Sequence, residues 1–136
     1  MVNPYSAYKR QSVQTMTPVE VIIKMYSEIE RQLAIAVCAI EDIKDIKKAN
    51  DSLIKAQELL GALRGSLDMS VPISKNLEEL YKFFQQETMK ANIKKDATEI
   101  KKIIPMIADL RDAFTQISQM TKEEIEAQAK ANSKKK

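Results

Sequence analysis

The chain has 136 residues, a formal net charge of +3 and 44% hydrophobic residues, which predicts one folded domain. It contains no histidine and a single cysteine, Cys38, so Ser-His and Cys-His catalysis, Glu-x-x-His metal sites and an internal disulfide are excluded. Only two glycines and four prolines accompany many Ala, Leu, Ile, Lys and Glu residues, and this composition predicts an all-α protein.

The N-terminal segment, residues 1–16, is too short to be a domain, yet it carries two of the chain's four tyrosines, Tyr5 and Tyr8. A tyrosine offers apolar area together with a hydroxyl that can stay at the rim of a contact. We therefore expect this segment to dock on the folded protein as a reversible cover. The next residues, Thr17 to Glu20, read Thr-Pro-Val-Glu, a capping box that predicts a helix starting at Pro18.

The first helix is predicted over about residues 18–43. Apolar side chains recur from Ile22 to Ile43 in steps of three and four, which is typical of a helix that faces a bundle core. Every residue between Leu33 and Ile40 is apolar, so the other side, around Ile35 and Cys38, should also be covered. Another helix, the N-terminal segment or a partner would provide that cover.

The second helix is predicted over about residues 46–68. Beside its core line runs a second line, Ile54, Gln57, Gly61 and Gly65, which holds both glycines of the chain. Each glycine costs roughly 1 kcal/mol relative to alanine inside a helix, so this line predicts a close backbone approach. Another helix of the bundle and a bound peptide are equally compatible with it. We take the line, together with Phe83 of the third helix, as a candidate peptide groove.

The third and fourth helices are predicted over about residues 73–92 and 97–120, after a break at Val71 and Pro72. Asn92 is expected to end the third helix in a left-handed conformation, and Asp96 with Glu99 to cap the fourth. The predicted core residues of the second helix are Ala49, Leu53, Ala56, Leu60, Leu63 and Leu67; of the third, Ile73, Leu77, Leu80, Tyr81, Phe84, Thr88 and Ala91; of the fourth, Ile100, Ile103, Ile107, Leu110, Phe114 and Ile117.

Pro105 and Arg111 are unusual residues for the interior and the apolar side of the fourth helix. Pro105 removes a backbone hydrogen bond, which predicts a kink or a local break. Arg111 lies on the apolar side, so its charge must be paired or must reach the rim of the bundle. In an antiparallel pairing with the first helix, Tyr26 and Glu30 lie at the same level as Arg111 and are its candidate partners. Residues 121–136 are predicted to form a short, marginal helix capped by Thr121, followed by a solvated lysine tail.

Connections of about two to six residues between long helices predict an antiparallel, up-down-up-down four-helix bundle over residues 17–120. The longest apolar run is too short to span a bilayer and no signal peptide is visible, so we expect a cytoplasmic protein without membrane insertion. Residues 1–129 hold 18 basic and 19 acidic residues, so the lysine tail favours solubility over nucleic-acid binding. No catalytic group, metal site or cofactor is predicted.

Six short stretches, taken together in order and spacing from about residue 3 to residue 119, resemble the FliS family of flagellin export chaperones. Three departures concern packing and turns: Phe114 stands where tryptophan is common, Lys95 where asparagine is common, and Val71-Pro72 replaces a glycine-containing turn. The stretches are Asn3 to Tyr8, Leu53 to Gln57, Leu63 to Asp68, Asn76 to Tyr81, Ala91 to Asp96 and Leu110 to Phe114.

The resemblance implies the same bundle, with the segment that holds Tyr5 and Tyr8 acting as a mobile cap. It also implies the partner: the disordered C-terminal segment of flagellin, kept from premature polymerisation and presented to the flagellar export gate. The residues by themselves indicate a binding protein and leave an alternative open. That alternative is a structural or adaptor bundle that associates with itself or with another amphipathic helix.

Overall fold

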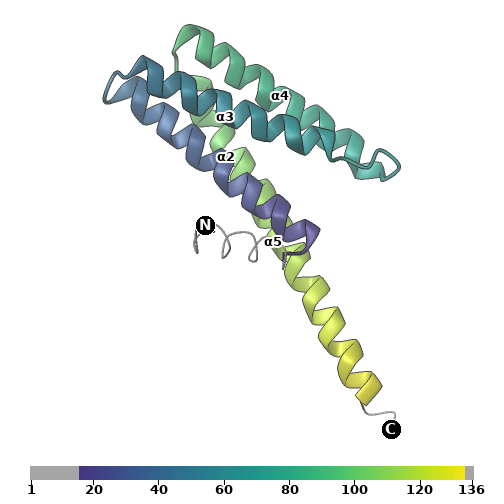
Figure 1. Ribbon diagram of the computed structural model, residues 1–136. Coiled ribbons are helices and arrows are strands. Elements are labelled where there is room, and N and C mark those ends of the chain that lie inside the picture. The colour runs from purple at the N-terminus through teal and green to yellow at the C-terminus, as the bar shows by residue number, and fades with distance from the viewer. Residues whose placement is uncertain (1–15, 134–136) are drawn as a thin grey trace, which may run out of the picture.

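The computed structural model describes residues 16–133, so Tyr5 and Tyr8 lie outside the described residues. Every described element is a helix, which confirms the predicted all-α bundle. The helices are α2 (Pro18–Glu41), α3 (Ile46–Gly65), α4 (Pro72–Lys94) and α5 (Thr98–Ser133) (Figure 1).

Each helix runs antiparallel to the one before it (Figure 1). α2 packs against α3 and α5, α3 against α4, and α4 against α5, so the four helices close a ring around one core. The α4–α5 contact is the smallest of the four. The C-terminal part of α5 extends beyond the end of the bundle (Figure 1).

Side-chain caps explain where the first two helices begin and end. Thr17 accepts a hydrogen bond from the backbone N–H of Glu20 at 3.2 Å, which confirms the predicted start of α2. α2 ends at Glu41 because the chain reverses through Lys44, whose φ of 56° is left-handed. Asp45 then caps α3 by accepting from the backbone N–H of Lys48 at 3.0 Å.

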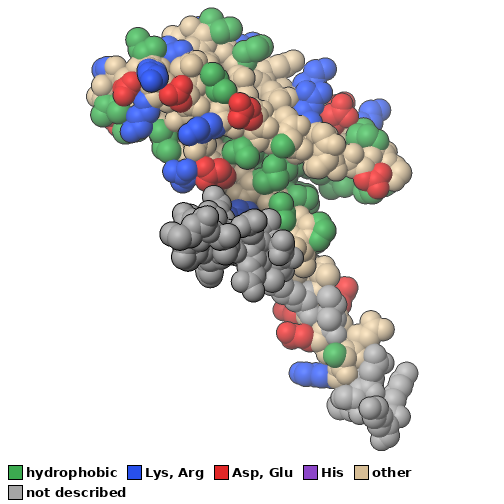
Figure 2. Space-filling view, viewed as in Figure 1, with side chains coloured by type: hydrophobic (Ala, Val, Ile, Leu, Met, Phe, Trp, Pro, Cys, Tyr) green, Lys and Arg blue, Asp and Glu red, His purple; other side chains and the backbone are tan. Residues whose placement is uncertain are grey.

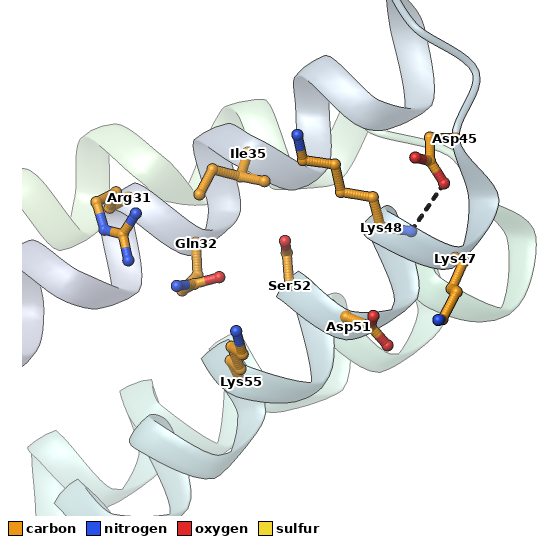
Figure 3. A pocket seen from close by; sticks show the side chains of 9 residues that line it. All are labelled: Arg31, Gln32, Ile35, Asp45, Lys47, Lys48, Asp51, Ser52 and Lys55. Atoms are coloured by element: carbon orange, nitrogen blue, oxygen red, sulfur yellow. Dashed lines mark hydrogen bonds between the residues drawn. The ribbon is translucent and has the colours of Figure 1, made fainter.

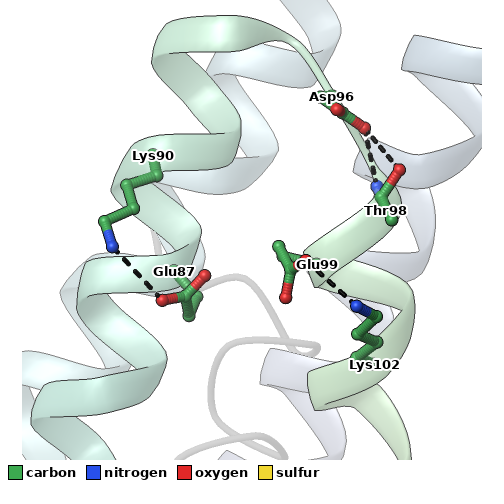
Figure 4. Close-up of polar contacts among 6 residues, drawn as sticks. All are labelled: Glu87, Lys90, Asp96, Thr98, Glu99 and Lys102. Carbon is green, nitrogen blue, oxygen red and sulfur yellow. Dashed lines mark hydrogen bonds and ion pairs between the residues drawn. The ribbon is translucent and has the colours of Figure 1, made fainter.

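The turn between α4 and α5 differs from the prediction (Figure 4). α4 continues to Lys94, and Lys95, with a φ of 52°, takes the left-handed position expected of Asn92. Asn92 stays helical because its side chain is hydrogen-bonded to α3. Asp96 accepts from the N–H and hydroxyl of Thr98, at 2.9 and 2.7 Å, instead of pairing with Glu99. Glu99 forms an ion pair with Lys102 at 3.2 Å.

Most predicted core residues are buried or half-buried, and three isoleucines are exposed. The predicted core rows of α2, α3, α4 and α5 each contribute fully buried side chains to one hydrophobic cluster. Ile43 is 53% exposed after the end of α2, and Ile73 is 56% exposed in the first turn of α4. Ile117 is 47% exposed in the distal part of α5. For these three isoleucines the core prediction is wrong.

α5 is one helix of 36 residues, so the predicted end near residue 120 and the separate short helix are wrong. Pro105 lies inside it and does not break it. The hydroxyl of Thr121 donates to the carbonyl of Ile117 at 3.0 Å, as an interior threonine does, and caps no new helix. Between residues 121 and 131, each side chain that the structure describes is exposed.

A polar and aromatic cluster joins α2, α4 and α5 inside the bundle. The hydroxyls of Tyr26 and Tyr81, both buried, are hydrogen-bonded to each other. The ring of Tyr26 also packs on Phe114, with centroids 5.6 Å apart. Next to this cluster, Nη1 of Arg111 lies 3.1 Å from Oε2 of Glu30, which confirms one of the two candidate partners of Arg111.

On the face drawn in Figure 2, basic and acidic side chains are interspersed over the bundle. Within residues 16–133, no helix combines the length and apolar character needed to cross a bilayer.

Candidate functional site

A row of polar contacts, which we call the polar ladder, runs along the seam between α3 and α4. Its members recur every seven residues on each helix, so they lie on one side of each helix and meet in antiparallel register. Asn92 donates to Asn50 at 2.9 Å, and Arg64 donates to Gln85 at 2.9 Å. The α3 members are Asn50, Gln57 and Arg64, and the α4 members are Glu78, Gln85 and Asn92.

Gln85 is the central rung of the ladder. Besides accepting from Arg64, it donates through Nε2 to the backbone carbonyl of Gln57 at 3.4 Å. Arg64 also lies 3.8 Å from the carboxylate of Glu78. These contacts are half-exposed, so each stabilises the fold little, but together they set how α3 and α4 are aligned.

A groove of about 300 Å³ lies over the ladder. Met89 on α4, 50% exposed, is its apolar lining residue, whereas Ile54 on α3 is 40% exposed but does not line it. Amide and cationic groups form the rest of the lining, which suits a peptide that presents both an apolar face and backbone hydrogen-bonding groups. The lining residues are Gln57, Arg64, Lys82, Gln85, Gln86 and Met89.

The two glycines differ in what surrounds them. A Cβ at Gly65 would meet no atom within 4 Å, so this glycine does not permit close packing inside the bundle. A Cβ at Gly61 would meet Nε2 of Gln85 at 3.4 Å, which is the end of a flexible side chain and not a backbone. These surroundings count against close packing of helices as the reason for the two glycines, and the bound peptide stays a prediction.

Phe83 does not join this groove. It is 40% exposed and its ring lies 5.9 Å from that of buried Phe84. Residues two apart on a helix point in directions about 200° apart, so Phe83 lies on the side of α4 opposite Gln85 and the seam with α3. The structure thus groups Gln57 and Gly61 around Gln85, and places Phe83 elsewhere.

A second, mostly apolar cavity of about 580 Å³ lies beside the first half of α2. Sequence reasoning missed it because Val21 and Leu59 lie off the predicted core lines. Met16, the last residue of the N-terminal segment and the first that the structure describes, lines this cavity. The remaining lining residues are Lys24, Met25, Glu28 and Arg31.

Glu28 and Arg31 form a fixed pair at the edge of that cavity. Arg31 donates to the carboxylate through Nε at 3.0 Å and through Nη2 at 2.7 Å, and Gln32 donates at 2.9 Å. These hydrogen bonds from Arg31 and then Gln32 lower the pKa of Glu28 to about 2. Within residues 16–133, no group of three Cys, Asp or Glu side chains is arranged to hold a metal ion.

Comparison with known proteins identifies a family. The sequence profile of the family described as "Flagellar protein FliS" matches residues 1–121. The chain is also 32% identical over 117 residues to the "Flagellar secretion chaperone FliS" of Bacillus subtilis (strain 168), covering 86% of this chain and 87% of that protein.

Proposed function

Because the chain belongs to the FliS family of flagellar proteins, we propose that it is a cytoplasmic flagellar secretion chaperone whose client is the C-terminal segment of flagellin. Holding this segment prevents premature polymerisation and keeps the client ready for the flagellar export gate. The family match over most of the chain is the observation that carries the proposal. A chaperone of this kind is a binding protein and requires no cofactor.

The surface of the bundle supports a client that wraps around it. The α3–α4 groove sets Met89 beside amide and cationic groups, which suits an amphipathic segment. We extend the client site along α3 to Ile54, Gly61 and Gly65. The apolar cavity next to Met16 offers a second place for large side chains. Ordering a disordered client costs several kcal/mol, so contacts on more than one face are needed to offset that cost.

The N-terminal segment supplies a cap in this proposal. Tyr5 and Tyr8 cover apolar surface of the free chaperone and leave it when the client binds. The cavity lined by Met16, Val21 and Met25 is the surface within easiest reach of this segment. The surface around Ile35 and Cys38, half-buried and exposed respectively, is the other candidate.

Calorimetry of the purified chain with the flagellin C-terminal segment tests the proposed function. We expect one-to-one binding with a large negative heat-capacity change, because apolar surface leaves water. Flagellin that lacks the segment is the control and should not bind. Absence of binding to the segment at tens of micromolar protein would contradict the assignment.

The alternative, a bundle that associates with itself, draws support from the distal part of α5. Ile117 and Met120 are 47% and 59% exposed there. Sedimentation of the purified protein separates the two functions. A monomer that binds the flagellin segment supports the chaperone, and a stable oligomer without flagellin affinity supports the alternative.

A further inference from the structure

A polar cavity of about 340 Å³ lies between the second half of α2 and the first half of α3 (Figure 3). Ser52 and Ile54 are two residues apart on α3 and so point in nearly opposite directions. The cavity is therefore on the other side of α3 from the α3–α4 groove. The residues that matter below are Arg31, Gln32 and Ile35 of α2 and Lys48, Ser52 and Lys55 of α3.

Ser52 has a hydroxyl that no other group in the described part of the chain engages. The residue is only 5% exposed, its hydroxyl points into the cavity, and it makes no hydrogen bond within residues 16–133. Gln32 beside it is 4% exposed and donates through Nε2 to Glu28, which leaves its Oε1 directed toward Ser52 (Figure 3). The floor of the cavity therefore offers a polar ligand one hydroxyl donor, on Ser52, and one amide acceptor, on Gln32.

Basic side chains outnumber acidic ones around this floor. Arg31 is bound to Glu28, and Lys55 acts on the same carboxylate electrostatically without a direct ion pair, whereas Lys48 forms no ion pair with any carboxylate that the structure describes. Of the two carboxylates that line the cavity, Asp45 accepts the N–H that caps α3, and Asp51 points away from the centre (Figure 3). A ligand oxygen that enters meets the ammonium groups of Lys48 and Lys55 and the hydroxyl donor of Ser52.

We propose that this cavity binds the carboxylate side chain of an acidic peptide segment in a partner protein. The carboxylate accepts from Ser52 Oγ–H and from Lys48 or Lys55. A peptide N–H donates to Oε1 of Gln32, and the aliphatic part of the ligand side chain lies on half-buried Ile35. A phosphate group fits less well, because it offers mainly acceptors and lacks the N–H that a peptide donates to Oε1 of Gln32.

Titration of the isotope-labelled full chain with the blocked peptide acetyl-Ala-Glu-Leu-amide, followed by NMR, tests the proposal. Saturable shifts are expected at the amides of Ser52 and Lys55 and at the side-chain amide of Gln32. The neutral counterpart acetyl-Ala-Gln-Leu-amide has the same shape, and it should bind at least about fivefold more weakly because the ion pairs are lost.

Two variants and one matched control locate the binding. Ser52→Ala removes the unpaired hydroxyl, so the melting temperature should stay equal or rise, while affinity for the acidic peptide falls about fivefold. Lys55→Gln should lower the affinity for the acidic peptide by a similar factor. Lys75→Gln removes the same charge from an exposed position on α4 and should leave the affinity unchanged.

The proposal is overturned by equal affinity for the acidic and neutral peptides, by shifts confined to other surfaces, or by unchanged affinity of Ser52→Ala and Lys55→Gln. Inorganic phosphate that binds as tightly as the acidic peptide would also overturn it. These measurements need no flagellin, so their failure and the failure of the chaperone assignment are distinguishable.

Discussion

At the scale of single residues, the Tyr26–Tyr81 pair ties α2 to α4 through two hydroxyls removed from water. Burial raises the pKa of both tyrosines, so both stay neutral and share one hydrogen bond. Tyr26→Phe should lower the free energy of unfolding by about 1 to 3 kcal/mol, because the hydroxyl of Tyr81 is left buried and unpaired. Urea denaturation measures the change.

The double variant Tyr26→Phe/Tyr81→Phe is the control for that prediction. It removes both hydroxyls, so it should be more stable than the sum of the two single changes. Additive losses would mean that the two hydroxyls do not depend on each other.

Two glutamates on α2 are expected to respond to pH in opposite ways. Burial, opposed by Arg111, raises the pKa of Glu30 above 4.5, so protonation of Glu30 favours the folded state. Its stabilising contribution is complete below pH 4.5 and is lost as pH rises through the native pKa. Glu28, at a pKa of about 2, stabilises above pH 4.5 and loses that contribution as pH falls toward 2.

Carboxyl NMR titration measures the two glutamates directly, and unfolding curves of Glu28→Gln and Glu30→Gln against pH check the signs. The effect of Glu28 on stability should be small because its side chain is 40% exposed. A common midpoint for Glu28 and Glu30 would contradict the assigned environments.

At the scale of helices, the groove along α3 can be tested through its glycines. Gly65→Leu places a side chain in open space and relieves a glycine penalty of roughly 1 kcal/mol, so stability should hold or rise. Gly61→Leu displaces only the end of Gln85. Both variants should lower the affinity for the flagellin segment about tenfold or more, measured by calorimetry, because the added side chain occupies the groove.

Ala62→Leu is the matched control, because Ala62 is exposed on α3 and next to Gly61 but on another side of the helix. It should leave the affinity unchanged. A clear loss of stability in Gly65→Leu, or unchanged binding in both glycine variants, would remove the groove from the client site.

The helices and most of the core follow from sequence because apolar periodicity reports one buried face per helix, as from Ile29 to Ala36. The ends of the helices are predicted less well from the sequence. Asn92 predicted a helix end, but its side-chain amide donates a hydrogen bond to Asn50, which lies 42 residues away along the chain. Val21 and Leu59 border a cavity that exists only once α2 and α3 are packed, so single-helix patterns do not reveal it.

At the scale of the whole molecule, the proposed N-terminal cap competes with the client. Deletion of residues 1–10 should tighten binding of the flagellin segment, because no docked tyrosines have to be displaced first. Calorimetry compares the full chain with the shortened one. If the segment is instead a permanent part of the fold, the deletion should cost stability and leave the affinity unchanged or lower.

Hydrogen exchange gives an independent measure of the same competition. The amides of residues 5–12 should lose protection when the flagellin segment is added. Equal protection with and without client would show that the segment is not displaced.

The polar ladder between α3 and α4 has a consequence for how this fold tolerates changes in length. Because its rungs repeat every seven residues on both helices, removal of one heptad from each helix moves the remaining rungs by the same amount and keeps them opposite one another. A single-residue insertion on one side would rotate every later rung by about 100°. Lengths of α3 and α4 that differ by matched heptads are therefore interchangeable, and unmatched lengths are not.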